Sequence, residues 1–114
     1  LSTSGGLFGI HGQALELRSQ RMGLIASNIA NAATPGYKAR DIDFAAALKA
    51  GNEGLKGGAA EVLYRQPAMP SLDGNTVELA AEQVAFTENA VGYSATLSFI
   101  RGRVENLTRA LKGD

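Results

Sequence analysis

The sequence has 114 residues, 45% of them hydrophobic, with 11 basic and 11 acidic side chains and a formal net charge of zero. A chain of this size forms one domain with a small core, and without a basic field it offers no surface for nucleic acid. The absence of cysteine excludes disulfides and thiolate metal sites, and no apolar run approaches the roughly 20 residues that span a bilayer. We therefore expect a single domain over residues 1–114, no nucleic-acid partner and no membrane insertion.

The first predicted element is a long helix within residues 1–33. From Leu7 to about Ala32, apolar residues recur over an arc about 200° wide when residues are placed at 100° intervals. One neighbouring helix needs a stripe only about 100° wide, so this helix is expected to have more than one apolar neighbour. Arg18 and Arg21 fall inside the arc, where arginine is tolerated if carboxylates lie within reach.

The second predicted region, residues 34–74, contains a turn, a short helix and a long irregular loop. Pro35-Gly36 suits the two central positions of a type II turn, since glycine accepts the positive φ required there. Asp43 can then cap a helix from Phe44 to Ala50, which Gly51 would close. The glycine-rich residues that follow are expected to be loop, with one short strand around residues 61–65.

The last predicted element is a helix over residues 75–114. Asn75 followed by Glu78 favours a capping-box start, and apolar residues then recur with heptad spacing. This apolar seam consists of Leu79, Phe86, Tyr93, Leu97, Ile100, Val104 and Leu107. A second face, displaced by about 140°, consists of Val77, Val84 and Val91.

These patterns predict an all-α fold in which long N-terminal and C-terminal helices pair as a coiled-coil hairpin. The apolar seam is expected to hold the two helices of one chain together, and the second face is expected to meet a neighbouring chain. A plain intramolecular core would also explain the heptads, but it leaves the second face without a role.

Residues with catalytic or metal-binding chemistry are scarce. His11 is the only histidine, so a catalytic triad or a multi-histidine metal site is excluded. Asp41 and Asp43 could suggest a metal or acid/base pair, but no third ligand stands at a suitable spacing, and helix capping by Asp43 is favoured. We expect no catalytic, metal or cofactor site, and no enzyme.

One segment identifies a family. Residues 26–38, ASNIANAATPGYK, resemble the signature of flagellar rod and hook proteins, in which a helix ending in Asn-Ile-Ala-Asn precedes Thr-Pro-Gly-Tyr. The continuation through residue 48 resembles one branch only, the proximal rod proteins, and residues 17–22 and 73–79 are similar to it too. Ala33 departs from the pattern, where the family often has a polar residue. The resemblance covers nearly the whole chain outside residues 51–70.

The resemblance implies a structural subunit of the bacterial flagellar basal body, in the periplasmic rod, which assembles helically and transmits torque from rotor to hook. It implies no catalysis and no cofactor, and export by the flagellum-specific secretion apparatus, which agrees with an N-terminus unlike a secretory signal peptide. The implied partners are other copies of the chain, other rod subunits, the basal-body adaptor protein and the export gate. The implied structural motif consists of Asn28, Asn31, Thr34, Pro35, Gly36, Tyr37, Arg40, Asp43 and Phe44.

Two alternatives stay open at this point. Another rod or hook protein, such as the C-type proximal rod protein, would share the turn, but the segment from Tyr37 to Phe44 argues against it. A secreted coiled-coil adaptor would share the helices but not the Thr-Pro-Gly-Tyr turn.

Overall fold

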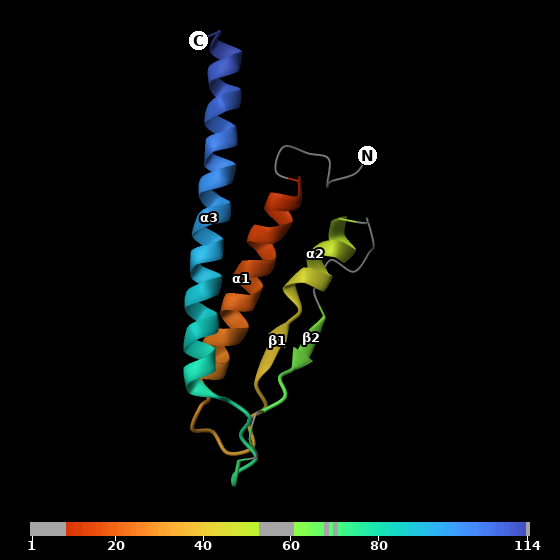
Figure 1. Cartoon of the computed structure of the whole chain (residues 1–114), viewed down its shortest axis with the longest axis vertical. Coiled ribbons are helices and arrows are strands. Elements are labelled where there is room, and N and C mark those ends of the chain that lie inside the picture. Colours follow the sequence, from red (N-terminus) through yellow and green to blue (C-terminus); the bar gives the residue numbers. More distant parts are fainter. Residues whose placement is uncertain (1–8, 53–60, 68, 70, 114) are drawn as a thin grey trace.

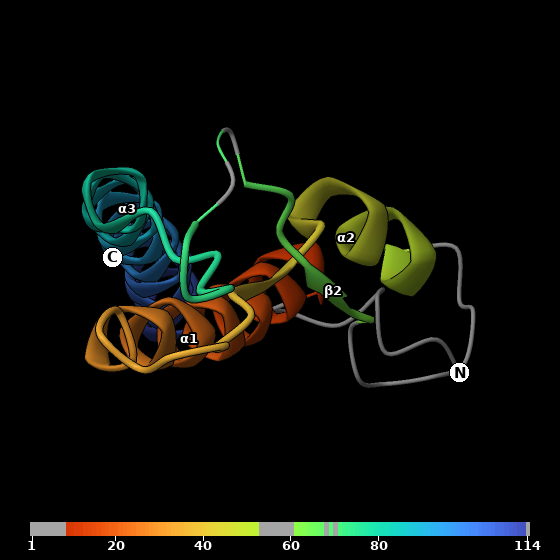
Figure 2. The ribbon, with the colours of Figure 1, turned by 90° about the horizontal axis from the view of Figure 1, so that it is seen from below.

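The computed structural model describes residues 9–52, 61–67, 69 and 71–113, and the molecule is elongated, measuring 64 × 28 × 17 Å. Its elements in chain order are α1 (Gly9–Ala30), β1 (Arg40–Ile42), α2 (Phe44–Asn52), β2 (Val62–Tyr64) and α3 (Leu79–Lys112). Helix α1 lies against one end of α3, and α2 and the two strands lie on another side of α1 (Figure 1). The same arrangement is visible along the molecular axis in Figure 2.

Helix α1 is the central element, because it contacts α3, α2 and β1. This confirms the prediction, drawn from its wide apolar arc, that it has more than one neighbour. The helix ends at Ala30, close to the predicted end, and its predicted start at Leu7 lies outside the described residues. Its buried apolar side chains are Ala14, Leu17 and Ile25.

Strands β1 and β2 form a two-stranded antiparallel sheet in which Asp41 is paired with Leu63. The prediction of a short strand within residues 61–65 is confirmed by β2. Strand β1 was not predicted, so the all-α assignment is correct for the long helices and wrong in omitting this sheet. A three-residue strand carries no readable periodicity, and its pairing depends on a partner about 20 residues away.

Helix α2 begins as predicted and ends later than predicted. The carboxylate of Asp43 accepts a hydrogen bond from the backbone N–H of Ala46 at 3.1 Å, which confirms the predicted cap. Gly51 does not close the helix, which continues to Asn52. The carbonyl of Gly51 accepts a hydrogen bond from the side chain of Gln13 in α1 at 3.4 Å, and a Cβ on Gly51 would lie 3.0 Å from that side chain. The glycine therefore serves close packing of two helices.

Helix α3 begins at Leu79, four residues after the predicted start. The capping-box prediction is wrong, because the side chain of Asn75 is bonded to the end of α1 instead. At the other end, Gly113 adopts φ 78° and donates its N–H to the carbonyls of Ala110 and Arg109, which terminates the helix.

The core is small and partly polar. Its buried apolar residues are Ala14, Leu17, Ile25, Ala39 and Ile42. Four polar side chains are buried with them: Asn28, Asn75, Glu82 and Asn89. Hydrogen bonding must compensate the desolvation of these groups, so their partners determine how the elements are held together. No helix within the described ranges is both long and apolar enough to cross a bilayer.

Candidate functional site

Asn28, in the last turns of α1, joins three elements. Its Nδ2 donates to the carbonyl of Arg40 at 2.8 Å and to Oε1 of Glu82 at 3.0 Å, and its Oδ1 accepts the N–H of Arg40 at 3.0 Å. The side chain is fully buried, at 0% exposure. Because the amide satisfies both backbone groups of a β1 residue, it acts as a substitute strand partner and fixes β1 against α1 and α3.

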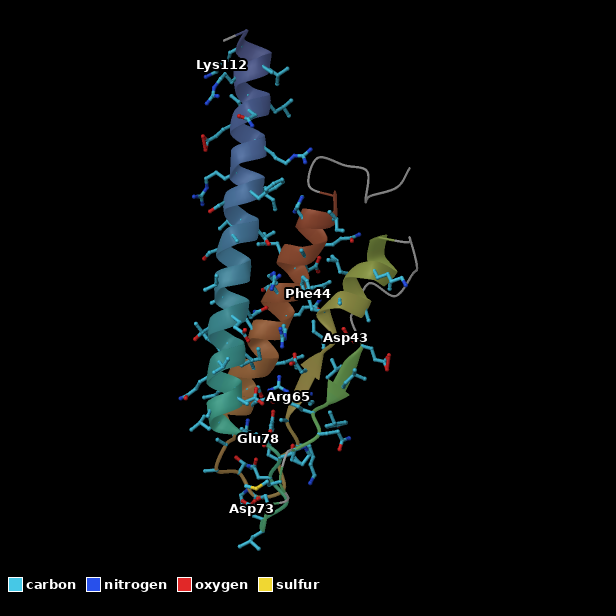
Figure 3. All side chains as sticks on the ribbon, viewed as in Figure 1. Asp43, Phe44, Arg65, Asp73, Glu78 and Lys112 are labelled. Carbon is cyan, nitrogen blue, oxygen red and sulfur yellow. The ribbon has the colours of Figure 1, made fainter. Side chains whose placement is uncertain are left out.

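An alternating chain of charges continues from Glu82. Arg65, which directly follows β2, is paired with the carboxylates of both Glu82 and Asp41. Asp41 also accepts two hydrogen bonds from Arg21 of α1, at 2.9 and 3.1 Å. Two cations and two anions therefore neutralise one another between α1, α3 and the sheet, and Figure 3 shows Arg65 in this position. Such pairs are favourable only when each charge also finds hydrogen-bonding partners, and Asp41 and Glu82 each have more than one partner here.

The electrostatics of Asp41 follow from these contacts. Burial by itself raises the pKa of its carboxyl group, but hydrogen bonds from Arg21, from the N–H of Ile42 and from Arg65 hold that pKa below its usual value. The hydrogen bond to Asp41 correspondingly raises the pKa of Arg21. The prediction that Arg21 is tolerated in the apolar arc because a carboxylate lies within reach is confirmed.

A tight turn reverses the chain after α1. The N–H of Tyr37 donates to the carbonyl of Thr34 at 3.2 Å, and Gly36 has φ 75°, as the third position of a type II turn requires. This confirms the turn predicted at Pro35-Gly36. The N–H of Gly36 donates to the carbonyl of Asp73 at 2.8 Å, so the turn is also joined to the segment that precedes α3.

Asn75 ties that segment to the end of α1. Its Nδ2 lies within hydrogen-bonding distance of three carbonyls at the end of α1, those of Asn31, Ala32 and Thr34, at 3.0, 3.1 and 2.7 Å. Its Oδ1 accepts the N–H of Val77 at 2.7 Å. These three residues form the turn that directly follows α1, so this buried amide ties the turn to a distant part of the chain.

The remaining motif residues all bond within the chain. The hydroxyl groups of Tyr37 and Ser27 lie 3.0 Å apart, and the Thr34 hydroxyl donates to Oδ1 of Asn31 at 3.0 Å. Phe44, the first residue of α2, lies beneath the guanidinium of Arg18, 4.2 Å from the ring centroid. The motif thus gathers around the end of α1 and the start of α2.

Arg18 also determines how closely α3 approaches α1. Its carbonyl accepts a hydrogen bond from the buried Asn89 at 2.7 Å. A Cβ on Gly92 would lie 2.5 Å from Nη1 of Arg18, so the glycine leaves room for the guanidinium to reach Phe44. Sequence reasoning placed Arg18 among carboxylates; its partner is an aromatic face instead.

The face of α3 that is buried in the chain is centred on Glu82 and Asn89, not on the apolar seam. Four members of the seam are half-buried: Phe86, Tyr93, Leu97 and Ile100. The other three, Leu79, Val104 and Leu107, are 45%, 38% and 45% exposed. On the second face, Val84 and Val91 are 59% and 65% exposed, whereas Val77 precedes the helix and is half-buried.

Comparison with known proteins shows the family. Residues 8–38, which include all described residues of α1 and the turn, match the model of the family described as flagella basal body rod protein. The chain is 51% identical to flagellar basal body rod protein FlgB of Cereibacter sphaeroides, with 93% of this chain and 94% of the relative covered. Identity to FlgB of Escherichia coli is 38%, covering 88% of each chain, and to FlgB of Salmonella typhimurium 39%, covering 89% of each.

The chain belongs to the FlgB family. It is a structural subunit of the flagellar basal-body rod, and the resemblance stated from the sequence is confirmed. This FlgB-family subunit has none of the groupings of three or more metal-binding side chains that would mark a metal centre, as far as the described residues extend.

Several residues that organise this FlgB-family chain were missed from the sequence. Asn75 was assigned to another role, Asp41 was considered only as half of a metal or acid/base pair, and Arg65, Glu82 and Asn89 were given no structural role. A signal existed for two of them: Glu82 and Asn89 are seven residues apart, on the heptad position beside the apolar seam. Polar residues at such spacing would ordinarily be assigned to solvent, so only the structure identifies their partners.

Proposed function

We propose that this FlgB-family chain is a stiff subunit of the proximal rod, which assembles helically with other copies and transmits torque from rotor to hook. The observation that carries the proposal is the exposed apolar surface of α3 on faces that the described chain leaves uncovered, with Val84 59%, Val91 65% and Leu111 81% exposed. Apolar surface of this extent on a long helix is typical of an assembly interface.

Stiffness is supported by the contacts at the end of α1. Asn28, Arg65 and Asn75 join segments that lie tens of residues apart, so the end of α1, the sheet and the start of α3 cannot move independently without breaking buried polar bonds. A torque-transmitting subunit needs such a connection between its helices. We infer that α1 and α3 work together as a helical hairpin, within a single domain of residues 1–114.

The two faces of α3 receive different roles in this proposal. The half-buried members of the apolar seam, Phe86, Tyr93, Leu97 and Ile100, serve pairing with α1 of the same chain. The second face serves contact with a neighbouring subunit, since it points away from the buried Glu82 and Asn89. The motif around Gly36 is structural and holds the corner between the helices.

Partners are proposed from the family. A rod subunit assembles with other rod components, and the resemblance to proximal rod proteins adds the adaptor protein and the export gate. We assign no catalytic function, and the proposed location is the periplasmic rod of the basal body.

Substitution of Val84 by Asp tests the assembly role. In a strain that lacks the chromosomal gene, the Val84→Asp chain should be exported but should not form rods, because a carboxylate on an apolar interface is left unpaired. Gln83→Asp is the matched control: it adds the same charge one residue away, at an exposed position on another side of the helix. Secretion assays and electron microscopy of basal bodies provide the measurements.

Ile100→Asp separates the two faces. This residue is half-buried and lies on the same face of α3 as the buried Glu82, so its substitution should lower helicity measured by circular dichroism, which Val84→Asp should not. Normal rods in the Val84→Asp strain, or equal effects of both substitutions on helicity, would contradict the division of faces.

A further inference from the structure

The last part of α3 extends beyond the described part of α1. The ring of His11, in the first described turn of α1, lies 4.3 Å from the ring of Phe99 of α3, centroid to centroid. The helix continues to Lys112, at the far end of the molecule in Figure 3. We call residues 101–112 the distal segment.

An apolar stripe runs along the distal segment. Val104, Leu107 and Leu111 follow Ile100 at intervals of three or four residues, which places all four on one face. Ile100 is half-buried, on the face of α3 that also carries the buried Glu82, whereas Leu107 and Leu111 are 45% and 81% exposed. The stripe therefore continues the α1–α3 interface into a region where no described residue covers it.

Charge is unevenly distributed between the distal segment and the rest of the chain. The segment holds four basic side chains and one carboxylate, all exposed: Arg101, Arg103, Arg109, Lys112 and Glu105. Its net charge is +3, Asp114 adds one negative charge directly after it, and residues 1–100 carry −2, because the whole chain has a formal net charge of zero. The molecule is 64 Å long, so this separation produces an electrostatic attraction between the tip of one copy and the body of another.

The second face of α3 provides a matching surface. Glu88 is exposed and stands four residues after Val84 and three before Val91, so a carboxylate lies beside the two exposed valines. No basic residue occurs in α3 before Arg101. A parallel copy displaced by about 30 Å along the helix axis, at 1.5 Å per residue, brings the distal stripe alongside this face.

We propose that the distal segment of one subunit docks on the second face of α3 of the next copy, with its apolar stripe against Val84 and Val91 and its basic residues towards Glu88. The proposal rests on the assembly function proposed above and deepens it by naming the partner surface. The distal segment and the second face are unlike surfaces, so the contact is head-to-tail and leaves one subunit of the pair with a free second face and the other with a free distal segment. A contact of this kind extends into an open assembly.

Complementary variants test the direction of the contact. Leu107→Asp disables the distal segment, and Val84→Asp disables the second face. Neither variant should therefore associate with itself in sedimentation experiments. Mixed together, they should form a one-to-one dimer, because the intact tip of one meets the intact face of the other. This dimer should weaken about tenfold between roughly 50 mM and 500 mM salt, since its charges are exposed.

A second pair of variants covers the possibility that Leu107→Asp disturbs folding. Arg103→Glu with Arg109→Glu reverses charge at exposed positions and should weaken association, and Glu88→Arg in the mixing partner should restore it. Homodimers of Leu107→Asp alone or of Val84→Asp alone would overturn the proposal. So would the absence of a dimer in the mixture of these two variants at about 1 mM chain. Lower helicity of dilute Leu107→Asp without any mixed dimer would also overturn it, in favour of an intramolecular role for Leu107.

Complementation distinguishes failure of this inference from failure of the proposed function. If the wild-type gene restores rods to a deletion strain and the Leu107→Asp gene does so equally well, only the docking proposal fails. If the wild-type gene does not restore rods, the proposed function itself fails.

Discussion

Replacing Arg65 by Met removes the cation that two carboxylates share. Asp41 keeps its bidentate bond to Arg21, but Glu82, at 0% exposure, keeps only the amide of Asn28. Breaking one side of a buried ion pair costs about 3–5 kcal/mol, because the remaining charge is left uncompensated. Methionine preserves the length of the side chain and the backbone N–H that donates to the carbonyl of Ala39. The free energy of unfolding should therefore fall by about 3 kcal/mol at pH 7.

Circular dichroism during titration with trimethylamine N-oxide measures the loss, because this osmolyte favours the folded state and gives free energies even for unstable variants. Arg101→Met is the matched control, at an exposed position of α3, and should change stability by less than about 0.5 kcal/mol. Adding Glu82→Gln to Arg65→Met removes the unpaired charge and should recover most of the loss. A loss below about 1 kcal/mol, or no recovery in the double variant, would refute the assigned role of the ion-pair network.

Three further predictions follow from backbone conformation, helix packing and titration. Gly36→Val should cost about 1–3 kcal/mol and abolish motility on soft agar, since φ is 75° there, whereas Gly36→Asn should be tolerated better. A Cβ at Gly102 would meet open space, so Gly102→Ala should raise the free energy of unfolding by about 0.5–1 kcal/mol and raise the thermal midpoint. Gly92→Ala should gain less stability, because its Cβ would meet Arg18, and equal gains from the two substitutions would contradict that contact. The pKa of Asp41 is lowered in the folded state, so its contribution to stability is complete above its unfolded pKa and is lost as the pH falls through the folded pKa. During acid titration, Asp41→Asn should therefore lose stability less steeply than the wild-type chain.

Local features of the fold could be predicted from the sequence because each depends on neighbouring residues. Pro35-Gly36 determines a turn through the φ of two residues, and Asp43 caps α2 through a bond to a residue three positions away. The wide apolar arc of α1 indicated several neighbours, since helical periodicity is itself local. The family signature spans this same local region, which explains why the family could be identified from the sequence.

The polar core was decided by tertiary structure alone. The bond between Asn28 and Glu82 joins residues 54 positions apart, and that between Asn75 and Asn31 joins residues 44 apart. A buried Glu82 has the same sequence pattern as a solvated one, and its burial is acceptable only because Arg65 and Asn28 arrive from other elements. Asn75 shows the same limit, because a helix-capping residue bonds whichever helix end lies nearest in space. Sequence periodicity thus determined where the helices lie, and hydrogen bonding between distant segments determined how they are held.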